Sequence, residues 1–178
     1  MKTLLILLLC VALLPFPVCS QAQVPDEHVT FGVEDVFQRP VSLPQDALQA
    51  LRASNDERDI IPECAMAEGI QPSEIPAAWF VASRIQLNRS SSAFVVRGEN
   101  RCLMGAHSAH FWVLGKSATG GYTVVFRGFG DGLSVLSTRT NHYRDLELTI
   151  LTGVAVESIK SRFSDGSYHE AGHTIEHH

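Results

Sequence analysis

The chain has 178 residues, of which 45% are hydrophobic and 19% charged, and its net charge at pH 7 is -5. The charge is unevenly distributed. Residues 23–76 hold 11 acidic residues against 3 arginines, whereas residues 77–178 hold 8 acidic against 10 basic residues. The first part is therefore an acidic segment, and no part is basic enough to predict nucleic-acid binding.

Residues 1–22 have the order of parts that is typical of a secretory signal peptide. Lys2 precedes an apolar run from Leu4 to Leu14, and small or polar residues follow. The run is too short to cross a membrane, and prolines end it. Lipid anchoring through Cys19 is disfavoured, because Phe16-Pro17-Val18 is a poor approach to a lipidated cysteine. We therefore expect an exported mature chain, secreted or periplasmic, without a transmembrane segment.

The mature chain of about 155 residues is long enough for one domain with a hydrophobic core. Its two cysteines are Cys64 and Cys102. Because export places them in an oxidising compartment, we predict one structural disulfide between them, with two free thiols as the alternative. The disulfide would close a loop of roughly 38 residues and contribute about 3 to 4 kcal/mol in the chain-entropy model.

Three segments precede the predicted sheet. Residues 23–41 show no clear periodicity and predict an extended lead-in. Residues 42–53 predict a helix, because Ser42 stands three residues before Gln45 as in a capping box, with a proline in the first turn. The apolar stripe of this helix consists of Leu43, Ala47, Leu48 and Leu51. Residues 55–76 hold acidic residues and prolines and predict a loop that Cys64 pins.

From Ala77 onward the periodicity changes from about 3.6 to 2 residues, which is typical of strands. The turns between the apolar runs are predicted at Gly98, Gly115, Gly120-Gly121, Gly130-Asp131-Gly132 and Asp165-Gly166. We therefore predict an α+β fold, mainly an antiparallel meander of about six to eight strands with one short N-terminal helix on one face. Residues 42–168 are expected to form a single β-rich domain, and residues 169–178 a polar, histidine-rich tail.

Parts of this pattern resemble uncharacterised exported bacterial proteins that carry a single FG-GAP-like strand motif, an Asp-x-Asn-x-Asp-Gly turn leading into an apolar strand. The segments that carry the resemblance are Ala82–Asn88, Phe94–Val96, Phe111–Leu114, Gly121–Tyr122, Gly132–Leu136, Thr138–Leu146 and Arg162–Tyr168. The resemblance implies an exported β-rich protein and no particular activity. The chain departs from the motif at residues 88–92, Asn-Arg-Ser-Ser-Ser, where a calcium loop would supply carboxylates.

The sequence HEAGH, residues 169–173, matches the H-E-x-x-H pattern of zinc proteases. On a helix, His169 and His173 would share one face and bind zinc, while Glu170 would act as the general base. Gly172 weakens such a helix, and the segment follows a predicted hairpin strand rather than an amphipathic run. A third ligand would come from upstream, where the candidates are His107, His110 and His142.

Two further interpretations of this tail stay open, a weak metal-binding histidine tail and a solvated segment without metal. Elsewhere the sequence has no G-x-S-x-G elbow and no complete phosphate loop, and paired cysteines leave no thiol nucleophile. We therefore expect no cofactor apart from the zinc that HEAGH would bind. The favoured function is an exported, non-enzymatic binding or inhibitor-like domain that acts on a protein or cell-envelope component. The alternatives are a zinc-dependent hydrolase acting through HEAGH and an envelope structural protein without a discrete ligand.

Overall fold

The structure, a computed structural model, describes residues 27–37, 39–53, 59–117 and 119–178. The predicted signal peptide over residues 1–22 and the start of the lead-in lie outside these residues. None of the described helices is long and apolar enough to cross a membrane.

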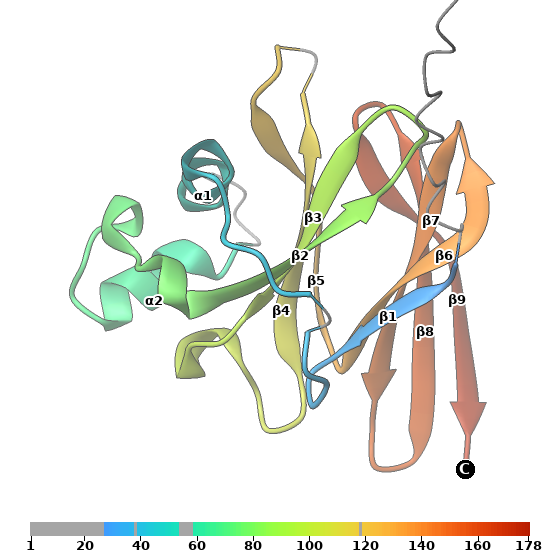
Figure 1. Cartoon of the computed structure of the whole chain (residues 1–178). Coiled ribbons are helices and arrows are strands. Elements are labelled where there is room, and N and C mark those ends of the chain that lie inside the picture. The colour runs from blue at the N-terminus through green and yellow to red at the C-terminus, as the bar shows by residue number, and fades with distance from the viewer. Residues whose placement is uncertain (1–26, 38, 54–58, 118) are drawn as a thin grey trace, which may run out of the picture.

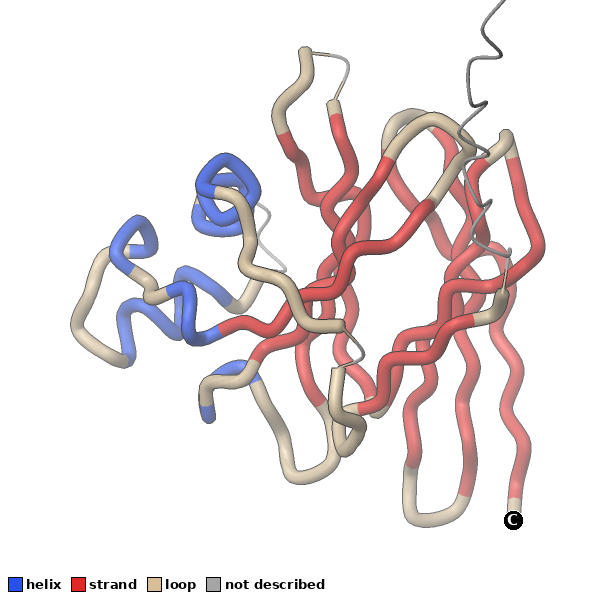
Figure 2. Tube along the Cα trace, viewed as in Figure 1, coloured by secondary structure: helices blue, strands red, loops and turns tan. Residues whose placement is uncertain are grey.

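Two antiparallel sheets lie face to face, and short helices cover the outer face of one of them (Figure 1, Figure 2). The strands are β1 (Val29–Gly32), β2 (Phe80–Gln86), β3 (Ser92–Gly98), β4 (Ala109–Lys116), β5 (Tyr122–Gly130), β6 (Gly132–Thr140), β7 (Tyr143–Leu151), β8 (Ala155–Ser164) and β9 (Ser167–His177). The helices are α1 (Gln45–Arg52), α2 (Ile61–Ala67) and the 3-10 helices η1 (Pro72–Glu74), η2 (Ala77–Trp79) and η3 (Arg101–Leu103). The larger sheet has the order β1-β6-β7-β8-β9, and the smaller sheet β2-β3-β4-β5.

The predicted antiparallel, mainly β architecture is confirmed, but the element count was too low. The described residues form nine strands and two α-helices, not six to eight strands and one helix. One strand that the sequence did not reveal is β1, which lies in the predicted lead-in over residues 23–41. Its four residues are too few to show an alternating pattern. The structure identifies β1 as a strand by its pairing with β6, in which Val29 lies opposite Val135.

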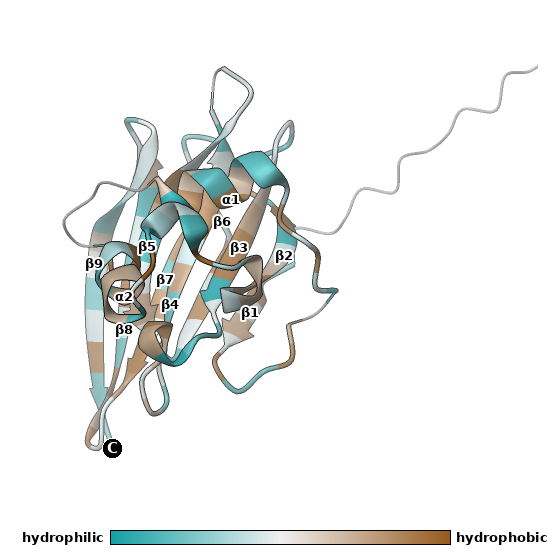
Figure 3. Cartoon of the chain, turned by 90° about the vertical axis from the view of Figure 1, so that its left-hand side faces the viewer, coloured by the Kyte–Doolittle hydropathy of each residue, from teal (hydrophilic) through white to brown (hydrophobic). Residues whose placement is uncertain are grey.

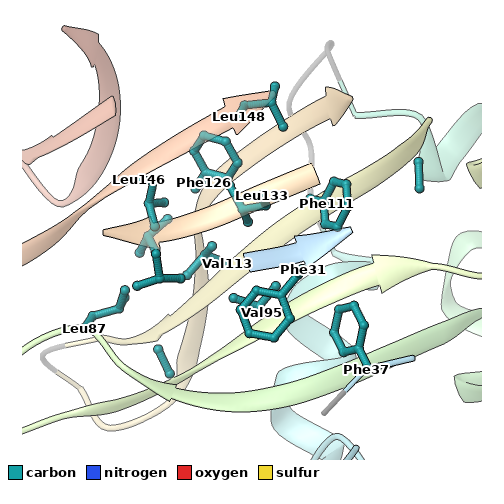
Figure 4. Packing of buried hydrophobic residues seen from close by; sticks show 14 residues of the cluster. Phe31, Phe37, Leu87, Val95, Phe111, Val113, Phe126, Leu133, Leu146 and Leu148 are labelled. Carbon is teal, nitrogen blue, oxygen red and sulfur yellow. The ribbon is translucent and has the colours of Figure 1, made fainter. Parts of the chain in front are cut away.

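Two hydrophobic cores hold the layers together. The first lies between the sheets and includes Phe31, Val95, Phe111, Phe126, Leu133 and Leu148 (Figure 4). The second lies between the smaller sheet and the helices and includes Leu51, Ile61, Phe94, Val96 and Trp112. Figure 3 shows the side on which α1 and α2 lie over the smaller sheet. Because β3 contributes to both cores, its residues 93–96, Ala-Phe-Val-Val, are all apolar and do not alternate with polar residues.

α1 confirms the predicted helix over a shorter range. Its buried residues are Ala47, Leu48 and Leu51, as the apolar stripe predicts. The chain before it stays extended, because the Val41 N–H donates to the Ala82 carbonyl at 2.8 Å and because proline restricts the residue that precedes it. Pro44 therefore occupies the N-cap position, and no side chain caps the helix. The predicted capping box at Ser42 is thus wrong.

The predicted loop over residues 55–76 is wrong from Ile61 onward, where α2 and η1 lie. A proline in the first turn of α2 and the buried stripe of Ile61, Cys64 and Ala65 are the helix signals in that segment. The Cys64 sulfur bonds to the sulfur of Cys102 in η3 at 2.05 Å. This confirms the predicted disulfide, which ties α2 to the connection between β3 and β4.

The predicted tail over residues 169–178 is instead most of β9. The preceding turn is confirmed, since Asp165 and Gly166 have φ values of 49° and 86°, the positive values that tight hairpins need. From this turn, β9 pairs with β8 along its whole length. The sequence hides this strand because polar side chains stand on both of its faces, so no apolar alternation marks it.

Candidate functional site at the edge of the larger sheet

The HEAGH segment lies in an edge strand and not in a helix. His169 pairs with Arg162 of β8, and His173 pairs with Ile159. Between these pairs the register shifts by one residue, which makes Ala171 a bulge in β9. Residues opposite each other in a ladder point to the same face, and Arg162 and Ile159 are an odd number of residues apart. His169 and His173 therefore lie on opposite faces of the sheet.

This geometry removes the basis of the zinc-protease interpretation. The His169 Nε2 atom lies 3.0 Å from the Ser167 Oγ atom, and the His173 Nε2 atom lies 3.3 Å from Glu157 Oε2. The Glu170 side chain is exposed. Zinc-bound nitrogens lie about 2.1 Å from the metal, so one ion cannot bind two histidines on opposite faces. Within the described residues, no three or more metal-ligating side chains form a group.

The three upstream histidines lie in separate parts of the fold. His107 is exposed in the loop before β4, where its Nδ1 atom is 3.6 Å from the Glu34 carboxylate. His142 lies in the turn between β6 and β7 beside Asn141, and both have positive φ, which confirms the predicted turn. His110 lies within β4. None of them joins HEAGH in a three-ligand group in the described chain.

A polar cluster that the sequence did not reveal lies beside His110. The Asp59 side chain is fully buried just before α2, where its Oδ1 atom accepts a hydrogen bond from the Ile61 N–H. Its Oδ2 atom lies 3.8 Å from the Nε atom of Arg127 on β5. Arg127 is paired with Trp112, whose ring stacks on His110 with centroids 5.9 Å apart. We assign this cluster a structural role, because the ion pair holds the start of α2 on the smaller sheet.

His110 makes stability depend on pH. Burial lowers the pKa of His110 below its ordinary value of 6.5, and the nearby Asp59 opposes this shift in part. On acidification the unfolded chain therefore binds a proton that the folded chain resists, so stability should fall from about pH 7 to pH 5. His110→Phe keeps an aromatic ring but does not titrate, so its thermal midpoint should fall less over this range.

The control is His178→Ala, which alters an exposed histidine and should keep the wild-type pH dependence of the midpoint. Equal slopes of midpoint against pH for wild type and His110→Phe would contradict the assignment.

The four edge strands of the two sheets differ in length and in exposure. β1 has only four residues. At β2, Pro40 of the lead-in bridges to Ser83, and β5, which contacts α1, has only two exposed residues. β9 is different, because its 11 residues are mostly exposed and no described segment pairs with its outer side. It lies at the rim of the molecule (Figure 1, Figure 3). A long uncovered strand edge is a template for a further strand.

The half of β9 that follows the bulge, residues 172–177 (the distal half), offers its backbone to that open side. The His178 N–H donates to the Val154 carbonyl at 3.2 Å, so residue 178 faces β8. In an antiparallel ladder every second residue bonds to the same neighbour, and the even-numbered residues of the distal half therefore also face β8. His173, Ile175 and His177 direct their N–H and C=O groups to the open edge.

The distal half also lies beyond the cover of the smaller sheet. At the start of β9, the Tyr168 ring packs on Phe126 with centroids 6.3 Å apart, and its hydroxyl donates to the Arg144 carbonyl at 2.6 Å. Burial, more than the neighbouring charges, raises the pKa of Tyr168 above 10.0. In the distal half, by contrast, Ile175 is 50% exposed, and the His173 side chain is 39% exposed. β9 is therefore anchored at one end and accessible at the other.

Comparisons with protein-family models, with curated proteins and with solved structures find no match for this chain. The candidate site is therefore defined by geometry alone. It consists of the open backbone groups of the distal half and the side chains on the face of β9 that is turned toward the smaller sheet (the inner face): His173, Ile175 and His177, with Glu157 of β8 beside them.

The HEAGH motif points to part of this segment, but it implies that His169 and His173 lie on one face. The bulge in β9 places them on opposite faces instead. The signal that was available is the tight turn at Asp165-Gly166, which predicts a hairpin and hence a strand through the histidines.

Proposed function

We propose that the protein is an exported binding domain that recruits an extended segment of a partner protein to the distal half of β9. The observation that carries this proposal is that β9 is long and mostly exposed, whereas the other edge strands are short or mostly not exposed. An incoming segment would become the sixth strand of the larger sheet. Its backbone would bond to His173, Ile175 and His177, and its alternate side chains would lie beside Ile175.

Export is part of the proposal. The disulfide between Cys64 and Cys102 is typical of oxidising compartments, and residues 1–22 have the pattern of a signal peptide. The partner would then be a secreted protein or a component of the cell envelope. Binding through a strand edge is also compatible with an inhibitor, because an added strand can hold a partner's segment in an extended, inactive form.

The two alternatives are less well supported. A zinc-dependent hydrolase needs His169 and His173 on one face, and the bulge puts them on opposite faces. An envelope structural protein without a discrete ligand gives no reason for leaving one long strand edge exposed.

The test is Ile175→Pro, which removes an outward N–H while keeping the inward bonds to β8, since proline is tolerated on edge strands that face solvent. Wild-type protein and this variant are immobilised and exposed to an extract of exported proteins from the native organism. We expect partner capture by the wild type and at least a tenfold loss with Ile175→Pro. In the purified complex, hydrogen exchange should slow at the amides of His173, Ile175 and His177.

The matched control is Ile175→Val, which keeps the N–H and a branched apolar side chain and should capture the partner as the wild type does. Equal capture by Ile175→Pro would show that β9 is not the binding site. Failure of every variant to retain any partner would favour the structural alternative.

A further inference from the structure

We propose that two copies of this chain pair through their β9 strands and so complete two sites for a divalent transition-metal ion, each formed by His173 and Glu157 of one copy and His177 of the other. The pairing uses the open edge described above but needs no other protein, so it goes beyond the proposed function. When formed, it would also cover the distal half and exclude a partner strand.

The backbone allows one symmetric arrangement that uses the whole distal half. Two copies related by a two-fold axis at Ile175 place this residue opposite its counterpart and place His173 opposite His177 of the second copy. All of these residues direct their N–H and C=O groups outward. Each such antiparallel pair exchanges two hydrogen bonds, so the larger sheets of the two copies become one continuous sheet.

The side chains favour the same register. The sequence His173-Thr-Ile-Glu-His177 has similar chemistry in both directions about its centre. Pairing about Ile175 puts the half-exposed isoleucines in contact and sets Thr174 against Glu176, so that no two glutamates are opposite each other. A shift of one residue for each strand would place Ile175 opposite His173 and lose the apolar pair. Register in a sheet is set by such matches.

The metal site follows from this register. Side chains of directly opposed residues have Cβ atoms about 5 Å apart, so the imidazoles of His173 and His177 of the second copy can reach one ion. Glu157 already lies 3.3 Å from His173 Nε2 and supplies a carboxylate that binds the ion or orients the imidazole. Imidazole and carboxylate together suit zinc and similar ions.

A single chain cannot build this site. Its own His177 lies opposite Ala155, and no group of three metal-ligating side chains occurs within the described residues. Conversely, pairing of a few edge residues alone buries far less than the roughly 1,000 Å² that stable interfaces bury. The ion and the strand pairing therefore depend on each other, and we expect a monomer without metal and a dimer with it.

The experiment is sedimentation velocity of the full mature chain in EDTA and in Zn²⁺, combined with metal analysis. We expect a monomer in EDTA and a dimer in Zn²⁺ with one zinc per chain. His173→Ala and His177→Ala should each abolish zinc-dependent dimerisation. His169→Ala is the matched control, because His169 lies on the outer face of the same strand and its loss should leave dimerisation unchanged. Glu157→Gln should weaken zinc binding by about 10- to 100-fold.

Mixing the two inactive variants distinguishes this site from zinc binding within one chain. In a dimer of His173→Ala with His177→Ala, one site has lost both histidines and the other keeps both. The mixture should therefore dimerise and bind about one zinc per two chains, although neither variant does so alone. Absence of this rescue, or a dimer that persists in EDTA, would overturn the proposal.

The outcomes for dimerisation and for partner binding can be told apart. If the protein captures a partner but never dimerises, only the dimer inference is overturned. If the protein dimerises but captures no partner, only the proposed binding function is left unsupported.

Discussion

Replacing both Cys64 and Cys102 by alanine is expected to lower the free energy of unfolding by about 4 kcal/mol. The disulfide closes a loop of 38 residues, and the chain-entropy model assigns a loop of this size about that contribution. Cys64 is completely buried in the core beneath α2, so the loss should also loosen the contact between this helix and the smaller sheet. Guanidinium chloride denaturation of the oxidised wild type and of the double variant measures the difference.

The control for this prediction separates the cross-link from the side chains. Wild-type protein reduced under denaturing conditions and kept reduced should show nearly the same midpoint as the double variant, because both lack the cross-link. The larger sheet, including β9, should keep its amide protection, because the disulfide lies on the other side of the molecule. A double variant as stable as the oxidised wild type would show that the unfolded chain is not constrained by this loop.

Local sequence patterns predict most of the fold. The missed elements are those in which such a pattern is absent or is obscured by neighbouring residues. The strands from β2 to β8 alternate or are continuously apolar because they face one core or two. β1 and β9 carry no such pattern, since one is too short and the other is mostly solvated on both faces. α2 was missed because acidic residues and prolines around it predict a loop, although its buried stripe follows helical spacing.

The candidate site was harder to predict than the fold for a physical reason. HEAGH has the right residue types for zinc, but ligand geometry depends on secondary structure, and a hairpin turn upstream decides that structure. Whether a strand edge is open depends on distant segments that can lie against it, such as Pro40, which bridges to Ser83 of β2. No local sequence pattern contains that information. The signal peptide and the resemblance to exported bacterial proteins stay predictions.

A large effect is also expected for Arg144, which follows the turn at Asn141 and His142. Its side chain is buried on β7, where Nε donates to the Leu136 carbonyl and Nη2 to the Val135 carbonyl, both at 2.7 Å. The ladder between β6 and β7 is irregular just after Val135, so the guanidinium supplies donors that the neighbouring strand does not. Arg144→Met leaves these buried carbonyls without their donors, at about 1 to 3 kcal/mol each.

We therefore expect Arg144→Met to lower the free energy of unfolding by about 2 to 6 kcal/mol in guanidinium chloride denaturation. Arg144→Lys keeps the charge but has one nitrogen instead of a planar fork, so it should recover only part of the loss. Arg101→Met is the surface control, since that side chain is 85% exposed and its ion pair with Glu68 should contribute less than about 1 kcal/mol. Because Tyr168 donates to the Arg144 carbonyl, the damage should extend to the start of β9 and raise hydrogen exchange there. An Arg144→Met protein with wild-type stability would mean that other donors satisfy these carbonyls, and that the anchoring of β9 does not depend on the irregular ladder beside it.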